Sequence, residues 1–136
     1  MTNEALAGHG NWRELPKKTF AEVVERLPEA LKKEGFGIIT QIDMQETLKA
    51  KIGVDFRRYR IFGACNPTFA HAALGHDLRV GVLLPCNVVV YENEGHAVVG
   101  AVNPVDTLGA AGAAPLQEIA REIDARLLRV LDAIAN

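Results

Sequence analysis

The stretch VGVLLPCNVVVYENEGHAVVGAV, residues 80–102, decides the fold. Two runs rich in β-branched residues, 80–91 and 96–102, flank a short NEG loop whose Gly95 suits the left-handed conformation of a hairpin turn. We therefore predict that the two runs pair as an antiparallel β-hairpin. Pro85 interrupts the first run. Because proline cannot donate a ladder hydrogen bond, it marks an edge or a bulge that can redirect the neighbouring Cys86.

Helical signals precede and follow this hairpin. A capping box of Thr19 and Glu22 opens a segment with an apolar stripe, in which Pro28 predicts a kink or a break because it removes a backbone donor. Asn66 can cap a short helix with Pro67 at its first position. The predicted helices span residues 19–35, 43–53, 66–75 and 115–136, and further strands are predicted at residues 36–42 and 56–65.

This order of elements predicts an α+β domain in which an antiparallel sheet is packed by helices, in a β-α-β(4)-α-like order. Residues 1–9 are small and polar without periodicity, which predicts a flexible N-terminal tail, so that residues 10–136 form a single domain. With 136 residues, 49% of them hydrophobic and 24% charged, the chain has an ordinary globular composition. A domain of this size buries roughly two thirds of its unfolded surface.

Composition and charge argue against several classes of protein. Fifteen basic and seventeen acidic side chains give a net charge of −2, which supplies no positive field for nucleic acid. The apolar runs fall short of the roughly 18 residues of a membrane span, and no signal peptide is evident. We therefore predict a cytoplasmic protein whose two cysteines are free thiols. The chain contains no serine, which excludes a Ser–His–Asp triad.

The two cysteines are the most informative chemical feature. Cys65 directly precedes the helix cap at Asn66, where free N–H groups and the helix dipole favour a thiolate. The alternative is that it packs as a small hydrophobe, as unpaired cysteines usually do. If the strands are adjacent, Cys65 and Cys86 would border one cavity with their sulfurs within about 10 Å. Because His71 and His76 share no helical face and no Cys-x-x-Cys pair is present, we predict no metal site.

Three stretches together resemble a known family. GACNP at residues 63–67, LLPCNVVVYE at residues 83–92 and the pattern that begins with EGFG at residues 34–37 look like the domain of unknown function 302, from about Thr19 to Ile134. The resemblance implies a small α+β domain of TATA-box-binding-protein-like topology, with a ferredoxin-like one as the alternative, that often forms dimers. The family's characteristic positions fall on Cys65, Asn66, Pro67, Leu84, Pro85, Cys86 and Glu92.

We refer to Cys65-Asn66-Pro67 and Leu84-Pro85-Cys86 as the first and the second motif. The leading hypothesis is a homodimeric domain that binds a small anionic or electrophilic ligand in a pocket between the two motifs. An alternative is a thiol-based redox or sulfur-handling enzyme, with Cys65 as nucleophile and Cys86 resolving or assisting it. A third hypothesis is a structural domain that acts through protein contacts. The candidate ligand-binding residues are Cys65, Asn66, Pro67, Cys86, Asn87 and Glu92.

Overall fold

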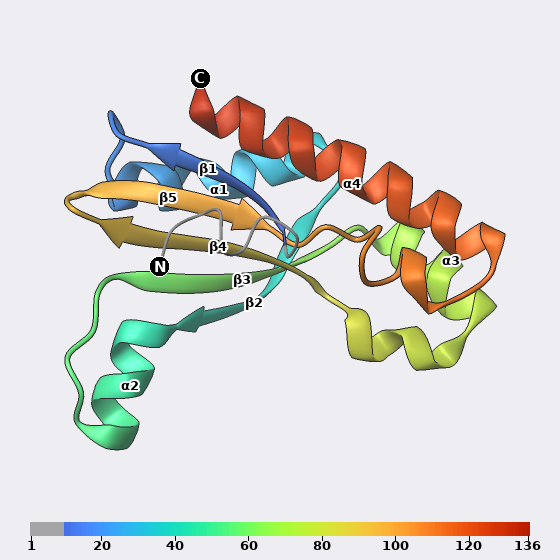
Figure 1. Ribbon diagram of the computed structural model, residues 1–136, viewed down its shortest axis with the longest axis horizontal. Helices are drawn as coiled ribbons and strands as arrows, with labels where there is room; N and C mark the ends of the chain where they lie inside the picture. The colour runs from blue at the N-terminus through green and yellow to red at the C-terminus, as the bar shows by residue number, and fades with distance from the viewer. Residues whose placement is uncertain (1–9) are drawn as a thin grey trace.

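The computed structural model describes residues 10–136. Within these residues five strands and four α-helices follow one another along the chain, together with two short 3₁₀ helices (Figure 1). The elements are β1 (Asn11–Leu15), α1 (Phe20–Lys33), β2 (Gly37–Asp43), α2 (Met44–Ile52), β3 (Tyr59–Cys65), α3 (Pro67–His76), η2 (Leu78–Leu83), β4 (Cys86–Asn93), β5 (His96–Ala101), η3 (Gly109–Ala111) and α4 (Ala114–Ala135). The predicted N-terminal tail, residues 1–9, lies outside the described residues.

All five strands form one antiparallel sheet in the order β1-β5-β4-β3-β2. The predicted hairpin is confirmed, with β4 paired to β5 so that Val90 faces Val99. Its turn contains Glu94 and Gly95, both with positive φ, and the value of 82° at Gly95 is one that glycine adopts without strain. The prediction of an α+β fold with an antiparallel sheet packed by helices is therefore correct.

The first strand of the hairpin is shorter than predicted. Residues 80–83 belong to the 3₁₀ helix η2, and β4 begins only at Cys86. The carboxylate of Asp77 accepts a hydrogen bond from the backbone N–H of Arg79 at 2.9 Å, which caps η2. Pro85, which has no N–H to donate, stands between η2 and the strand. The prediction that Pro85 interrupts a strand is thus wrong, because this proline precedes the strand.

The helices begin where the capping signals predict. In α1 the Thr19 hydroxyl accepts from the backbone N–H of Glu22 at 3.1 Å, and the Glu22 carboxylate accepts in return from the backbone N–H of Thr19 at 3.4 Å. The helix continues through Pro28, so the break does not occur. Pro28 is exposed, whereas Leu27 and Leu31 beside it are fully buried. Their packing offsets the one hydrogen bond that the proline removes.

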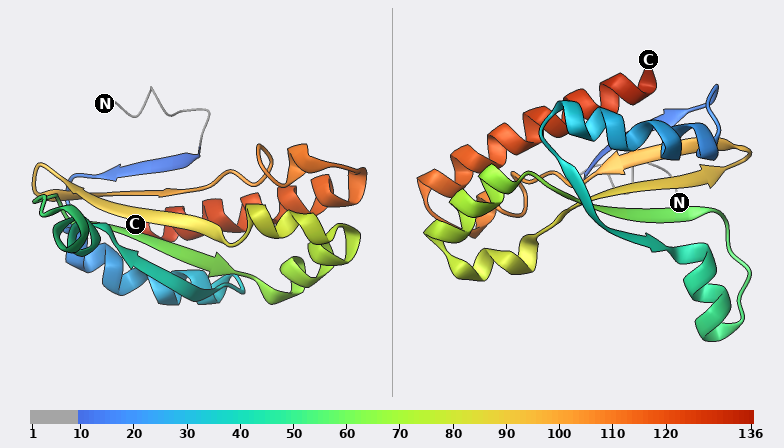
Figure 2. Two further views of the ribbon diagram at one scale, coloured as in Figure 1. Left: turned by 90° about the horizontal axis from the view of Figure 1, so that it is seen from below. Right: turned by 180° about the vertical axis from the view of Figure 1, so that it is seen from behind.

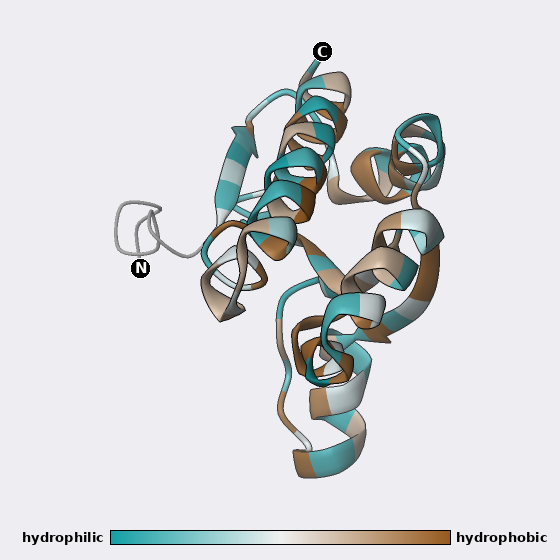
Figure 3. Cartoon of the chain, turned by 90° about the vertical axis from the view of Figure 1, so that its right-hand side faces the viewer, coloured by the Kyte–Doolittle hydropathy of each residue, from teal (hydrophilic) through white to brown (hydrophobic). Residues whose placement is uncertain are grey.

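The two faces of the sheet differ in what covers them. Helices α1 and α4 lie side by side against one face, which we call the inner face (Figure 2). The buried residues of α4 follow the predicted stripe, and its hydrophobic side turns toward the rest of the chain (Figure 3). None of the described helices covers the opposite, outer face. There the rings of Trp12, Tyr91 and Tyr59 form a row, with centroids 6.2 Å and 5.6 Å apart.

The two ends of the sheet also differ. Helix α3, η2 and the N-terminal half of α4 gather at the end where β3 stops and β4 starts, whereas α2 projects from the opposite end (Figure 1). Helix α2 has no buried residue, and Ile52, Val54 and Phe56 at its end and in the following loop are all exposed. Within residues 10–136, the core therefore continues beyond the sheet only at the end that carries both cysteines.

Candidate functional site

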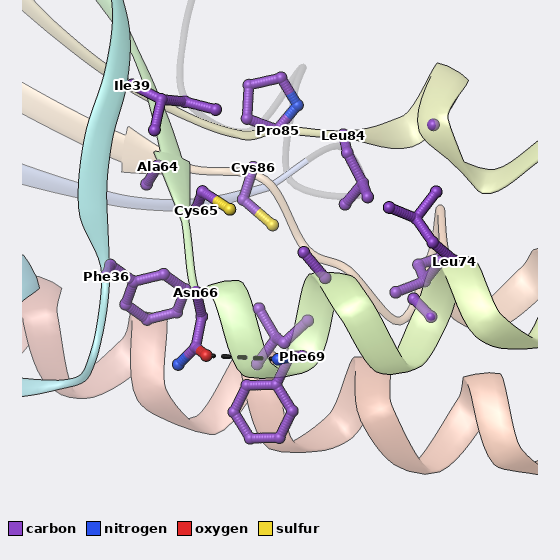
Figure 4. A pocket seen from close by; sticks show the side chains of 15 residues that line it. Phe36, Ile39, Ala64, Cys65, Asn66, Phe69, Leu74, Leu84, Pro85 and Cys86 are labelled. Atoms are coloured by element: carbon purple, nitrogen blue, oxygen red, sulfur yellow. Dashed lines mark hydrogen bonds between the residues drawn. The ribbon is translucent and has the colours of Figure 1, made fainter. Parts of the chain in front are cut away.

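A cavity of about 260 Å³ lies between the cysteine end of the sheet, α3 and α4 (Figure 4). Among the described residues, none of the side chains that line it is charged. They are contributed by the segments that precede and form β2, by β3, by α3 and its cap, by η2 and the residues that link it to β4, by the start of β4, by the residue before η3, and by α4. The lining residues are Phe36, Ile39, Ala64, Cys65, Asn66, Phe69, Ala70, Ala73, Leu74, Gly81, Leu84, Pro85, Cys86, Leu108 and Ile123.

The first motif forms one rim of this cavity because it joins a strand to a helix. Strand β3 ends at Cys65, and the side-chain oxygen of Asn66 accepts a hydrogen bond from the backbone N–H of Phe69 at 3.3 Å. Pro67 is the first residue of α3, as predicted, and is exposed. Asn66 itself is only 9% exposed, which makes it the one buried polar side chain in the described part of the chain. The cap therefore fixes the direction in which Cys65 enters the cavity.

The start of α3 has few free backbone N–H groups that could bind an anion. Pro67 has no N–H, and the N–H of Phe69 is bonded to the Asn66 side chain. The N–H of Ala70 donates to the Asn66 carbonyl at 2.9 Å. Only the N–H of Thr68 is left in the first turn. The lining thus favours an apolar ligand over the anionic one that a helix start suggests.

The second motif forms the opposite rim. Cys86 opens β4, lies directly opposite Ala64 of β3 and is 7% exposed. Pro85 is held against β3 because Gly63 has no side chain there: a Cβ at position 63 would lie 2.6 Å from Cγ of Pro85. The Leu84–Pro85 peptide bond is cis. The second motif therefore crosses the end of β3 in close contact with it.

Both cysteines are free thiols whose sulfurs point into the same space (Figure 4). Cys65 is half-buried, whereas Cys86 is buried. Burial raises the pKa of the Cys86 thiol to about 11, and the nearby Cys65 adds a smaller effect in the same direction, since two thiolates would repel each other. At neutral pH Cys86 is therefore protonated. The two thiols are therefore inequivalent in their access to solvent.

Three of the predicted site residues do not lie at this cavity. Pro67 is exposed and is not among its lining residues. Asn87 is exposed on the outer face, where it borders a separate hollow beside Trp12. Glu92 lies at the far end of β4, where its backbone carbonyl accepts from the Arg57 guanidinium at 3.3 Å. The structure thus brings together Cys65, Asn66 and Cys86, and separates them from the other three candidates.

Several residues outside the two motifs also line the cavity. Phe36 and Phe69 flank Asn66 (Figure 4), and Ile123 of α4 adds to the lining. The hydrophobic stripe of α4 identified Ile123 as a core position but gave no sign of a cavity next to it. Phe69 carried a weak signal, because it is the third residue after the predicted cap and so lies near the helix start.

Neither a metal centre nor a membrane-spanning helix is found within residues 10–136. That part of the chain holds no group of three or more His, Cys, Asp or Glu side chains placed to bind a metal ion. His71 and His76 are exposed. None of its helices is both long and apolar enough to cross a membrane.

The fold and this cavity define a class of protein: a small α+β domain whose antiparallel sheet has helices on one face and ends in an apolar cavity with two thiols. The chain belongs to the family described as domain of unknown function DUF302, whose model matches residues 13–134. It is similar to the crystal structure of an uncharacterized conserved protein DUF302 from Bacillus stearothermophilus, with 37% identity and a TM-score of 0.82 over 90% of this chain and 95% of that one. No curated protein matches it.

Proposed function

We propose that this protein binds a small, uncharged, apolar ligand in the cavity between the two motifs. The observation that carries the proposal is the cavity itself, which both cysteines and Asn66 border. Ligand sites are typically concave and mostly apolar, with a few polar groups that orient the ligand. Here the thiols and the Asn66 amide are those polar groups.

The size and the walls of the cavity limit the ligand. A volume of about 260 Å³ lies just below the usual range for drug-sized molecules, roughly 300 to 1,000 Å³, so the ligand has few heavy atoms. A carboxylate or phosphate placed between Phe36, Phe69 and Leu74 would lose its hydration without gaining a charged partner. Short aliphatic or aromatic molecules fit these limits.

The proposal can be tested with the unreactive probes dipropyl sulfide and benzene. A ligand that binds only the folded state raises the thermal midpoint as its concentration rises. We expect Ala70→Leu, which adds bulk at the lining of the cavity, to abolish this rise. Ala72→Leu is the matched control, because Ala72 lies on the same helix but is exposed and outside the lining. A wild-type midpoint that neither probe moves would contradict the proposal.

A second candidate function is thiol chemistry at the same cavity, favoured by the presence of two free thiols on its lining. A third is a purely structural domain. Alkylation of the native protein with iodoacetamide separates these two: reaction at Cys65 at neutral pH supports thiol chemistry, whereas thiols that react only after unfolding support the structural role.

We also propose that the chain is cytoplasmic, does not bind nucleic acid and forms a homodimer. The outer face supports the dimer. Five strands spaced by about 4.8 Å, each about 20 Å long, present a face of roughly 500 Å², about three fifths of the roughly 800 Å² that each partner buries in a standard interface. Its aromatic row of Trp12, Tyr91 and Tyr59 is the composition that interfaces favour. Light scattering that gives a monomer mass at all concentrations would contradict the dimer.

A further inference from the structure

We propose that Cys65 and Cys86 act as an exchanging thiol pair toward small apolar disulfides that enter the cavity, with Cys65 as the attacking and Cys86 as the resolving thiol. This inference rests on the proposed ligand-binding cavity and adds the chemical class of the ligand and the fate of the two thiols.

The backbone brings the two cysteines within disulfide reach. Ala64 lies directly opposite Cys86 in the β3–β4 ladder, and Cys65 is the next residue along β3. From the spacing of antiparallel strands, the Cα atoms of Cys65 and Cys86 lie about 6 Å apart. Disulfides span Cα separations of about 4.4 to 6.8 Å. No rearrangement of the sheet is therefore needed to join the two sulfurs.

Neighbouring residues of a strand normally point to opposite faces, yet both sulfurs face the cavity. The reason is that β3 ends at Cys65 and the chain turns into α3 at the Asn66 cap. Figure 4 shows the two sulfurs side by side above the start of α3. The cap that orients Cys65 is therefore also what allows the two thiols to meet.

Access decides which thiol attacks. Cys65 is half-buried at the rim and can meet an incoming molecule, whereas Cys86 is only 7% exposed. Burial also raises the pKa of Cys86 to about 11, so this thiol is protonated at neutral pH. Because the thiolate is the nucleophile, Cys86 can act only after Cys65 has reacted and placed a disulfide beside it.

The exchange consists of two balanced steps. In the first, the Cys65 thiolate attacks one sulfur of the disulfide R–S–S–R, forming a mixed disulfide and releasing one thiolate R–S⁻. In the second, Cys86 loses its proton to water and attacks the Cys65 sulfur, forming the Cys65–Cys86 disulfide and releasing the second thiolate. Two protein thiols are thereby oxidised and the external disulfide is reduced to two thiols.

The apolar lining of the cavity determines which disulfides can enter it. The lining holds no charged side chain, so a disulfide with charged substituents must shed water in the cavity without a partner. An uncharged, compact disulfide meets no such penalty. We therefore expect preference for small apolar disulfides over charged ones such as oxidised glutathione.

The test compares dithiodipyridine, which is uncharged, with dithiobis(nitrobenzoate), which carries two carboxylates. Relative to a small free thiol, the wild-type protein should favour the uncharged reagent by at least about tenfold, since the cavity excludes charge. It should release two pyridinethione molecules, the second at a rate independent of reagent concentration and rising with pH. Its final mass should be lower by two hydrogens. Equal relative rates, or a product with two mixed disulfides, would overturn the proposal.

Two variants assign the roles. Cys86→Ala should release one pyridinethione and keep the mixed disulfide, because the resolving thiol is missing. Cys65→Ala should lose the fast release. Release that is unaffected by Cys65→Ala would overturn the assignment. Circular dichroism of each variant shows that it is folded, and alanine introduces no polar group into the cavity.

A final measurement separates this inference from the proposal on which it rests. Dipropyl sulfide has the shape of an apolar disulfide substituent but no S–S bond, so it reports binding without exchange. Binding of this thioether by a protein that forms no Cys65–Cys86 disulfide would overturn the exchange inference and leave the ligand site standing. Exchange by a protein that binds neither the thioether nor benzene would support the thiol pair and overturn the general ligand site.

Discussion

The inner and outer faces of the sheet are built from the same strands but differ in how deeply their side chains are buried. On the inner face Phe62, Val88 and Val90 are at most 1% exposed beneath α1 and α4. On the outer face Ile61, Val89 and Tyr91, the residues next to them in sequence, are only partly buried. Side-chain alternation thus assigns one set to the core and leaves the other available for contacts. The cavity forms at the cysteine end of the sheet, where α3 packs beside α4.

The sharpest test of this difference is a pair of neighbouring substitutions on β3. Phe62→Ala removes a ring that is 1% exposed, and we expect a loss of about 3 to 5 kcal/mol in the free energy of unfolding. Ile61→Ala, on the outer face, should cost less than about 2 kcal/mol because its side chain is only half-buried. Urea denaturation measures both. Equal losses would mean that the outer face is as well covered as the inner one.

Most of the fold could be predicted because its signals are local. The capping box at Thr19, the cap at Asn66 and the glycine in the 93–95 turn act through neighbouring backbone groups, and each lies where the sequence places it. The errors arose where tertiary packing dominates. Helix α1 continues through Pro28 because Leu27 is buried in the core.

The second test concerns the buried thiol on the inner face. Because the pKa of Cys86 is raised from 9.0 to about 11 by burial, the unfolded chain ionises first as the pH rises. The raised pKa adds about 2 to 3 kcal/mol to the free energy of unfolding. This contribution is fully present below about pH 9 and is lost as the pH rises toward 11. Cys86→Ala lacks this loss.

The measurement is the difference in unfolding free energy between wild type and Cys86→Ala from pH 8 to pH 11, in which lysine and tyrosine ionisation cancels. A difference that stays constant over this window would show that Cys86 is solvated in the folded protein. The inner face would then be open to water at its cysteine end, and the contrast with the outer face would be weaker there.

The third test applies to the outer face. Gly100 lies beneath the indole of Trp12, and a Cβ there would lie 2.6 Å from the ring atom Cζ3. We expect Gly100→Ala to cost about 1 to 3 kcal/mol through this overlap and to shift the fluorescence of Trp12, the only tryptophan. Gly37→Ala on β2 is the control, since a Cβ at position 37 would meet no atom within 4 Å. If Gly100→Ala costs as much stability in a Trp12→Leu background, the overlap with the indole is not the cause of the loss.

The candidate site was predicted in part. The sequence predicted that Cys65 and Cys86 border one cavity only if their strands are adjacent, and the adjacency itself comes from the structure, in which Cys86 lies opposite Ala64. Asn87 and Glu92 were grouped with them by motif alone. Alternation turns Asn87 to the outer face, and Glu92, the seventh of the eight residues of β4, lies near the far end of the strand. Asn87 and Glu92 are therefore close to Cys86 in the sequence, but neither lies at the cavity.

The smallest expected effect distinguishes the two asparagines that follow the cysteines. Asn66 caps α3 and is 9% exposed, whereas Asn87 is exposed and caps no helix; its backbone carbonyl accepts from the N–H of Val102 at 3.0 Å. We expect Asn66→Ala to cost about 1 kcal/mol and Asn87→Ala less than about 0.5 kcal/mol. Asn66→Asp, which keeps a capping oxygen, should recover most of the loss. Equal stability of the two alanine variants would mean that Asn66 stabilises the fold no more than Asn87 does. The cap at Asn66 would then not be what orients Cys65.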